Sequence, residues 1–111
     1  MEELEAGIPE WDQGQIERAL EHGESFALFL YTPLCGTCQL AKRMVAVAAK
    51  ICSPVSPYTA NLNLMPALAQ ALRIESVPCL MIVRQGEIVS KEYAMRSVDH
   101  LCRQLGLLMD K

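Results

Sequence analysis

The most constraining feature of this sequence is an apolar run that leads directly into two closely spaced cysteines. Residues 26–31 carry no charge, and such a short continuous apolar run is typical of a strand buried on both faces of a sheet. Pro33 ends the strand because proline has no N–H to donate to a neighbouring strand. Residues 39–51 contain neither glycine nor proline and are rich in alanine, which predicts a helix. Cys35 and Cys38 therefore lie between a buried strand and a helix.

This position of the two cysteines predicts redox chemistry. The first turn of a helix has N–H groups without intrahelical partners, and together with the aligned peptide dipoles they favour a negative charge nearby. A thiol at this position loses its proton more readily, and the thiolate is the form that attacks a disulfide. We expect Cys35 to be the nucleophile, with Gly36 leaving the approach to it open. We expect Cys38, on the same side of the first helical turn, to resolve the resulting mixed disulfide.

Two other uses of a C-x-x-C pair stay open at this point. Half of a zinc site has this spacing, but zinc takes about four ligands, and the sequence has no second C-x-x-C and no H-x-x-x-H to complete the site. Cysteines also serve as small buried hydrophobic residues, a role that Gly36 and Thr37 between a strand and a helix do not favour. A C-x-x-C near a strand–helix–strand pattern in a cytosolic protein is a signature of redox activity. We therefore expect no resident metal and no other cofactor.

Length, charge and cysteine content narrow the function classes. A chain of 111 residues is large enough for one core, so we expect a single domain over residues 1–111, with residues 1–11 loosely ordered. The net charge of −3 and the scattered basic residues do not favour nucleic-acid binding. No apolar run approaches the length of a membrane span, and the acidic start does not resemble a signal peptide. Five cysteines, with one close pair among them, fit a reducing cytoplasm better than a secreted protein held by disulfides.

The rest of the chain alternates between helical and strand patterns. Asp12 and Gln15 have the spacing of a capping box, and Gly86 lies in a turn that predicts a hairpin after a second buried run. The helices are expected over residues 13–22, 39–51, 64–72 and 98–109. The strands are expected over residues 26–31, 55–62, 79–83 and 88–93. This order predicts an α/β fold, with a mixed sheet of about four strands flanked by helices on both faces.

One apolar face is expected along the helix over residues 39–51. The residues that keep its helical spacing are Leu40, Met44, Val47, Ala48 and Ile51. The methionines of the chain, Met44 and Met95 among them, are expected to fill the core because they are too dispersed to form a surface of their own.

With these elements in place, the chain resembles the thioredoxin family over nearly its whole length. Three marks coincide: C-G-T-C after a buried strand, Val77-Pro78 before another buried strand, and a hairpin with Gly86 at its turn. The resemblance implies the thioredoxin fold and a cis peptide bond before Pro78, which faces the cysteine pair in the family. It also implies that Val77 offers backbone hydrogen bonds to an extended substrate peptide. Gly36 and Thr37 are expected to line the same shallow groove.

The resemblance implies a function as well. We expect a thiol–disulfide oxidoreductase in which Cys35 attacks the disulfide of a protein, a peptide or a small molecule and Cys38 resolves the mixed disulfide. A thiol reductase or a small thiol is the expected electron donor. The alternative is a binding, adaptor or redox-sensing module of the same fold whose cysteines are catalytically weak.

The sequence departs from the family pattern at positions that bear on the second step of the expected reaction, the attack of Cys38 on the mixed disulfide. Leu34 and Thr37 replace the tryptophan and proline of the familiar W-C-G-P-C motif, so the reduction potential does not carry over. Phe29 stands where family members have a buried acid that helps to deprotonate the second cysteine. The lysine that accompanies this acid in the family is missing too, because its position falls near Thr59. A buried thiol without a nearby base has a raised pKa, so we expect Cys38 to react slowly.

Three further cysteines lie outside the C-G-T-C motif. Cys79 follows the proline where family members usually have threonine, and the resemblance implies that it lies near the cysteine pair. We expect it to be a small buried strand residue; the alternative is an extra thiol that exchanges with the pair or helps to bind a metal or cluster. Cys52 and Cys102 occupy helix positions consistent with packing, and we predict no role for them.

Overall fold

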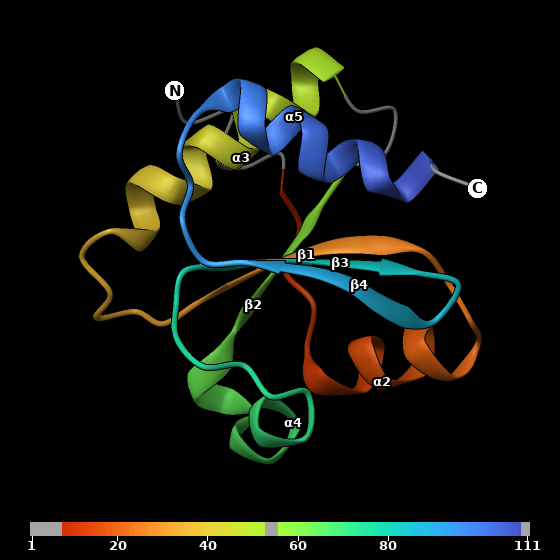
Figure 1. Ribbon diagram of the computed structural model, residues 1–111. Coiled ribbons are helices and arrows are strands. Elements are labelled where there is room, and N and C mark those ends of the chain that lie inside the picture. Colours follow the sequence, from red (N-terminus) through yellow and green to blue (C-terminus); the bar gives the residue numbers. More distant parts are fainter. Residues whose placement is uncertain (1–7, 53–55, 110–111) are drawn as a thin grey trace.

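The computed structural model describes residues 8–52 and 56–109, which are built on one mixed sheet of four strands. The strands are β1 (Phe26–Tyr31), β2 (Tyr58–Asn61), β3 (Cys79–Arg84) and β4 (Glu87–Glu92). Their order across the sheet is β2-β1-β3-β4 (Figure 1), with β2 parallel to β1 and the other two pairs antiparallel. The two buried runs of the sequence are therefore the central strands. β2 is shorter than the predicted strand over residues 55–62, of which Val55 lies outside the described residues.

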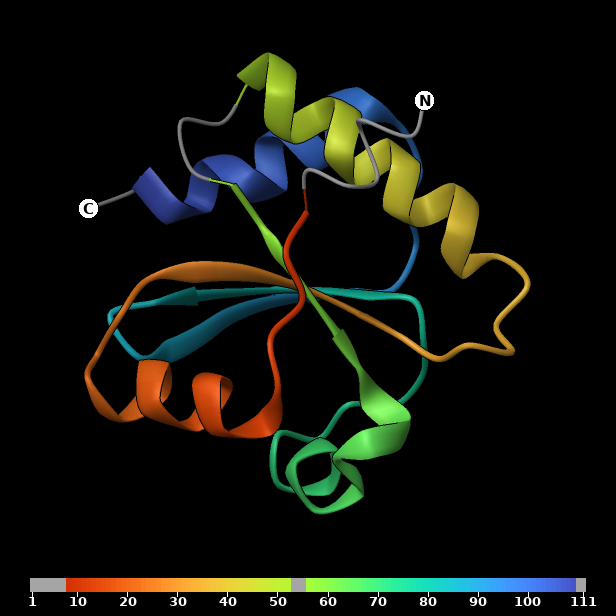
Figure 2. The same ribbon diagram turned by 180° about the vertical axis from the view of Figure 1, so that it is seen from behind.

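Helices cover both faces of this sheet (Figures 1 and 2). α3 (Cys38–Cys52) and α5 (Val98–Gly106) lie on one face, and α2 (Gln13–Glu21) and α4 (Pro66–Ala71) lie on the other. Short 3-10 helices precede α4 at Leu62–Leu64 and follow α5 at Leu107–Met109. This arrangement confirms the predicted fold class. Within the described part of the chain, none of the helices is long and apolar enough to cross a membrane.

The alternation of side chains along the central strands divides the core into two layers. In β3, Leu80 and Ile82 pack against α3 and α5, whereas Cys79, Met81 and Val83 lie in the layer with α2 and α4. All five side chains are completely buried. Because successive residues of a strand point to opposite faces, one continuous apolar run supplies both layers.

Two local signals determine their elements directly. At the start of α2, the Asp12 carboxylate accepts a hydrogen bond from the Gln15 N–H (2.8 Å), and the Gln15 side chain accepts one from the Asp12 N–H (2.9 Å). Between β3 and β4, Gln85 and Gly86 have φ angles of 53° and 82° and form a two-residue turn. A Cβ on Gly86 would lie 3.0 Å from the Leu20 carbonyl oxygen, so this turn requires glycine.

The segment before α2 is held more firmly than the sequence suggests. Ile8 is buried, and the Trp11 N–H donates a hydrogen bond to the Thr59 carbonyl oxygen (2.8 Å). The Trp11 ring also stacks on Tyr58, with the ring centroids 3.9 Å apart. This segment therefore lies along the outer edge of β2, with Ile8 and Trp11 as its anchors. Residues 1–7 lie outside the described residues.

The face of α3 that packs on the sheet matches the predicted one only in part, at Ala48 and Met44. Ala41, Val45 and Ala48 are buried against the strands, whereas Leu40 and Ile51 are 62% and 70% exposed. Small alanine side chains let the helix approach the sheet closely, and close packing then leaves the larger side chains outside. The apolar spacing that predicted a core face therefore belongs in part to the surface.

Candidate functional site

The two cysteines of the C-G-T-C motif lie where β1 ends and α3 begins. Residues 32–37 connect the two elements, and the Cys35 N–H donates a hydrogen bond to the Thr32 carbonyl oxygen (3.1 Å) in this loop. Cys38 is the first residue of α3. The two cysteines form a disulfide, with their Cα atoms 5.4 Å apart. The predicted position of the pair between a strand and a helix is confirmed.

The two cysteines differ in exposure. Cys35 is half-buried in the loop, whereas Cys38 is only 4% exposed, so Cys35 is the more accessible cysteine of the pair. Both lie at the N-terminal end of α3, where unpaired N–H groups and the helix dipole favour a thiolate once the disulfide is reduced. The Thr37 Oγ1 atom lies 3.6 Å from the Cys35 sulfur, so its hydroxyl adds a weak hydrogen-bond donor to the site.

A pocket of about 170 Å³ brings ionisable side chains next to the pair. Tyr31 and Lys42 line this pocket together with Cys35 and Cys38. The Tyr31 hydroxyl donates to Glu10 Oε1 (3.0 Å), and burial, followed by this carboxylate, raises the pKa of Tyr31 to about 12. Tyr31 therefore keeps its proton at neutral pH and does not act as a base. Lys42 places its Nζ 5.8 Å from the centre of the Tyr31 ring and adds a positive charge to the pocket wall.

The positions expected to lack a base do so in the structure. Phe29 and Thr59 are partners in the adjacent strands β1 and β2, and both are buried. The Thr59 hydroxyl has no hydrogen-bond partner among the described residues. Neither side chain ionises near neutral pH, so slow attack by Cys38 stays a prediction that rests on these two residues.

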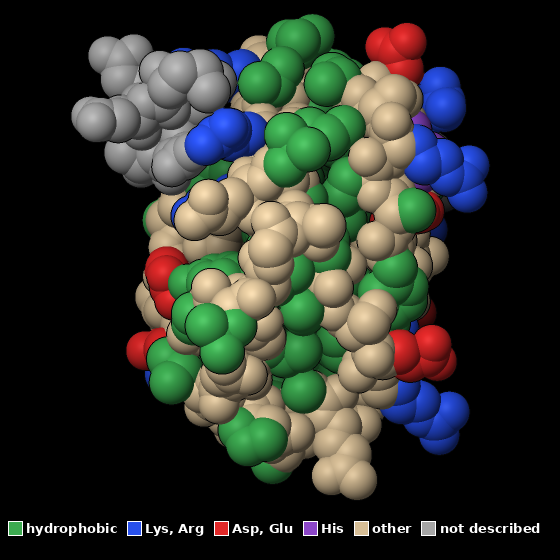
Figure 3. Space-filling view, turned by 90° about the vertical axis from the view of Figure 1, so that its left-hand side faces the viewer, with side chains coloured by type: hydrophobic (Ala, Val, Ile, Leu, Met, Phe, Trp, Pro, Cys, Tyr) green, Lys and Arg blue, Asp and Glu red, His purple; other side chains and the backbone are tan. Residues whose placement is uncertain are grey.

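A shallow groove of about 210 Å³ lies next to the motif. It is lined by residues of the loop, of α3 and of two segments that border β3 and β4: Thr37, Leu40, Ala41, Met44, Pro78, Tyr93 and Met95. The Val77–Pro78 peptide bond is cis, as the resemblance implied. Figure 3 looks onto this end of the molecule, where hydrophobic side chains gather on the surface.

The groove brings together two of the four residues that were predicted to bind substrate. Thr37 and Pro78 both line it. Gly36 is exposed beside Thr37, where a Cβ would meet no other atom, so the approach to the motif is open. Val77 is half-buried and packs against the core layer of α2 and α4, which leaves its backbone as the part that a peptide could reach.

Sequence reasoning missed the apolar side chains of this groove. Met44 and Met95, which were predicted to fill the core, are half-buried against the layer of α3 and α5, and they also line the groove together with Leu40 and Tyr93. The signal was present in the helical spacing of the apolar residues in α3. Because a core face and an apolar groove produce the same spacing, the pattern alone did not separate the two.

Cys79 lies apart from the cysteine pair. It is fully buried in the layer with α2 and α4, whereas α3, which carries Cys38, covers the opposite face of the sheet. Burial raises the pKa of Cys79 to about 11, against a smaller lowering by Lys91 and the Tyr93 hydroxyl. Cys79 is thus the small buried strand residue that was predicted. The alternative of an extra thiol that exchanges with the pair or helps to bind a metal stays a prediction.

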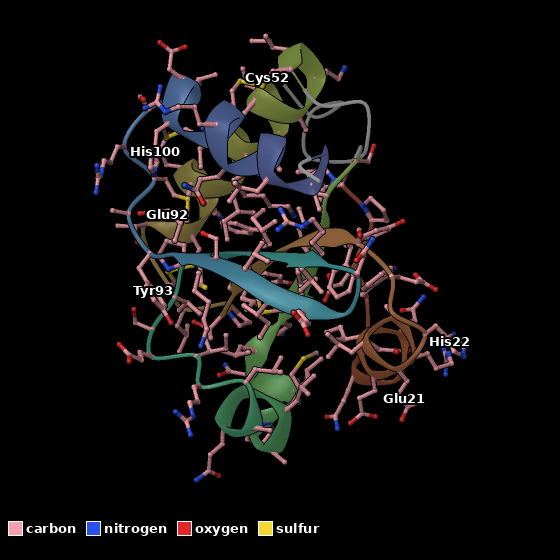
Figure 4. The ribbon with its side chains drawn as sticks, turned by 45° about the vertical axis from the view of Figure 1, so that its right-hand side comes forward. Glu21, His22, Cys52, Glu92, Tyr93 and His100 are labelled. Carbon is pink, nitrogen blue, oxygen red and sulfur yellow. A yellow bond between two sulfur atoms is a disulfide. The ribbon has the colours of Figure 1, made fainter. Side chains whose placement is uncertain are left out.

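The structure contains a second disulfide that the sequence did not predict. Cys52, the last residue of α3, is bonded to Cys102 of α5, 50 positions later in the sequence, with Cα atoms 5.8 Å apart. Figure 4 shows Cys52 at the end of α3 that lies away from the C-G-T-C motif. The prediction that these two cysteines have no role is therefore wrong. Since Cys79 is the one cysteine left unpaired of five, cysteine content no longer favours a reducing compartment.

Comparisons with known proteins agree with this geometry. A sequence model of the thioredoxin family matches residues 11–106. The thioredoxin-like protein YusE of Bacillus subtilis (strain 168) is 44% identical over 87 residues, which are 77% of this chain and 82% of YusE.

Solved structures of thioredoxins superimpose on nearly the whole chain. A mutant thioredoxin from Halobacterium salinarum NRC-1 has a TM-score of 0.76 at 19% identity and covers 94% of this chain and 91% of its own. Thioredoxin f from spinach chloroplast has a TM-score of 0.78 at 19% identity, with 99% and 95% covered. These likenesses show that the fold is the thioredoxin fold.

Proposed function

Because the chain belongs to the thioredoxin family, we propose that it is a thiol–disulfide oxidoreductase that acts through Cys35 and Cys38. The observation that carries this proposal is the closed disulfide between these residues at the N-terminus of α3, next to the groove of Pro78. A pair in this place is close enough to form a disulfide, and the helix end favours the thiolate that opens another.

In the proposed reaction, the Cys35 thiolate attacks one sulfur of a substrate disulfide. A mixed disulfide forms, and the other substrate sulfur leaves as a thiolate. Cys38 then loses its proton and attacks Cys35 Sγ, which closes the Cys35–Cys38 disulfide and releases the second substrate thiolate. Two electrons pass from the pair to the substrate. A thiol reductase or a small thiol then supplies two electrons and restores the dithiol.

Proposed substrates are disulfides in extended segments of proteins or peptides. Thr37 and Pro78 would contact the segment in the groove, whose apolar walls favour an apolar side chain beside the disulfide. Gly36 leaves room for the segment to reach Cys35. The backbone of Val77 would hydrogen-bond the segment, as in an added strand.

A second candidate is a binding or redox-sensing module. It is favoured by one observation, the absence of an ionisable side chain at Phe29 and Thr59, which leaves Cys38 without an acceptor for its proton there. In this case Cys35 would form mixed disulfides with partners, and Cys38 would clear them too slowly for turnover.

The cytoplasm is the proposed location, with its thiol reductases and small thiols as electron donors. Fractionation of the source cells, followed by immunodetection of the chain, tests this part of the proposal. Recovery of the chain outside the cytoplasmic fraction would contradict the proposed location. The electron donors would then be those of the compartment in which the chain is found.

Reduction of insulin by dithiothreitol tests the proposed activity. The native protein is expected to accelerate the reaction, and Cys35→Ser is expected to abolish the acceleration because the attacking thiol is lost. Cys79→Ser, on the opposite face of the sheet, is the matched control and should retain most of the activity. If the native protein is folded and gives no acceleration, the binding or redox-sensing function takes the place of the enzymatic one.

A further inference from the structure

The second disulfide joins two helices that already pack together. Ala48 of α3 lies in one buried cluster with Leu101 and Leu105 of α5. This apolar contact does not depend on the disulfide, so it keeps Cys52 and Cys102 near each other when the bond is open. The pair is therefore arranged to close again after reduction.

The surroundings of the pair accommodate both redox states. The Ala48 carbonyl oxygen lies 2.8 Å from the Cys52 sulfur and 3.9 Å from the Cys102 sulfur. When the pair is reduced, a thiol can donate its S–H to this nearby oxygen. Opening the bond thus leaves the thiols with an acceptor in place.

The pair is also accessible, and it is isolated from the first pair. Cys52 is exposed, whereas Cys102 is half-buried. α3 has 15 residues, and at about 1.5 Å per residue its two terminal cysteines lie roughly 20 Å apart. No sulfur of one pair reaches the other pair across this distance. Electrons for the second pair therefore come from solution.

We propose that Cys52 and Cys102 are a second thiol–disulfide exchange site, which low-molecular-weight disulfides close and low-molecular-weight thiols open, and which fastens α5 to α3 when closed. This site is independent of the proposed activity of the first pair. Its exposed sulfur admits a small reagent, and its half-buried partner is shielded from a folded protein.

The exchange proceeds in two balanced steps. The Cys52 thiol loses its proton and attacks a small disulfide, which forms a mixed disulfide on Cys52 and releases one small thiolate. The Cys102 thiol then loses its proton and attacks Cys52 Sγ, which closes the protein disulfide and releases the second small thiolate. Two electrons pass from the pair to the small disulfide. Two molecules of a small thiol reverse both steps.

Equilibration with glutathione tests the site in a Cys35→Ser/Cys38→Ser background. As the glutathione mixture becomes more oxidised, alkylation and mass spectrometry should show the loss of two free thiols, and peptide mapping should join Cys52 to Cys102. Return to reduced glutathione should restore both thiols. The proposal is wrong if both thiols stay free in every mixture, or if reduced glutathione fails to open the bond in the folded protein.

A second variant tests the order of the steps. With Cys102→Ser added to the background, one glutathione should accumulate on Cys52, at least about fivefold faster than on Cys102 in the matched Cys52→Ser variant, because exposure controls access. Faster addition to Cys102 would overturn entry through Cys52. If the background protein does not fold, the native chain is equilibrated with the same glutathione mixtures. It should show two separate transitions, each with the loss of two free thiols, and a single transition would overturn the proposal.

Thermal unfolding of one sample in its two redox states tests the fastening of α5. The closed form should unfold about 15 °C higher than the open form, because the bond closes a long loop in the unfolded chain. Equal midpoints would show that the bond forms without fastening the helix.

Discussion

α3 carries one cysteine of each disulfide, and its two ends place them in different electrostatic surroundings. At its first residue, Cys38 pairs with Cys35 only three positions away, next to the unpaired N–H groups of the first turn. At its last residue, Cys52 pairs with Cys102 across 50 positions, next to the unpaired carbonyl groups of the last turn. The helix dipole favours a thiolate at the first end and disfavours one at the second. Position on one helix thus distinguishes a reactive pair from a more persistent one.

The two pairs also differ in what they do for stability. In the chain-entropy account, a bond across 50 positions stabilises the fold by about 4 kcal/mol and a bond across three positions by about 2 kcal/mol. Opening the first pair therefore disturbs the fold less than opening the second. This difference suits a pair that would open in every cycle of the proposed reaction.

The largest change in turnover is expected to distinguish Cys38 of the first pair from Cys102 of the second. Cys38→Ser should lower turnover in insulin reduction by about 100-fold, because the mixed disulfide on Cys35 is no longer resolved. Cys102→Ser should leave turnover within about twofold, since its pair lies at the other end of α3. Steady-state rates and mass spectrometry of the trapped mixed disulfide measure both effects. A folded Cys102→Ser protein as inactive as Cys38→Ser would bring the second pair into catalysis.

Phe29→Asp adds a base next to the first pair and leaves the surroundings of the second pair unchanged. Phe29 is buried and lines the pocket of both motif cysteines, so a carboxylate there would accept the Cys38 proton. Release of mixed disulfides, followed by stopped-flow, should accelerate about tenfold, which is modest for a general base. The opening of the second disulfide by glutathione should not change.

Phe29→Asn is the matched control for this variant because it has the size of aspartate without its charge. It should give no acceleration. Circular dichroism checks that both variants are folded, since a buried polar group lowers stability. A folded Phe29→Asp protein with unchanged or slower release would contradict the argument about the missing acid.

Two lysines of α3 provide a matched pair of smaller effects. Lys42 lines the pocket of the motif cysteines, beside Tyr31, whereas Lys50 lies in the last turn. A nearby cation lowers the pKa of a thiol, so Lys42→Met should raise the pKa of Cys35 and slow its alkylation at pH 7 by about threefold. Lys50→Met should not change this rate. The pH dependence of iodoacetamide alkylation of the reduced protein measures both, and equal effects would exclude a local role of Lys42.

The last prediction concerns the stability of the fold and the cysteine that belongs to neither pair. The pKa of Cys79 is raised from 9.0 to about 11 in the folded protein, so the folded state keeps a proton that the unfolded state loses in this range. The resulting stability is fully present below pH 9 and is lost as the pH rises through 11. Cys79→Ser should therefore lose less stability than the native protein between pH 8 and 11, by about 1–2 kcal/mol.

Urea unfolding at several alkaline pH values measures this difference. Tyr31, whose pKa is also raised, is present in both proteins, so its contribution cancels. Parallel stability curves for the two proteins would mean that Cys79 ionises as freely in the folded state as in the unfolded one.

Elements governed by neighbouring residues could be predicted from the sequence. The capping box of Asp12 and Gln15, the turn at Gly86 and the two buried strands all formed as expected. Each depends on contacts or backbone angles within a few residues, or on an apolar run that suits a strand covered on both faces. The pairing of the segment around Trp11 with β2 was not predicted, because β2 lies far away in the sequence.

The Cys35–Cys38 pair follows from local sequence, because a separation of three positions at a helix start keeps two sulfurs within reach whatever the rest of the chain does. Tertiary structure alone decided that Cys52 meets Cys102, since this contact depends on how α5 packs against α3 over the shared sheet. It also decided that alanines of α3 face the core while Leu40 lines the groove. The spacing of apolar residues shows that a helix has an apolar side, whereas close packing against a particular neighbour determines which side is buried.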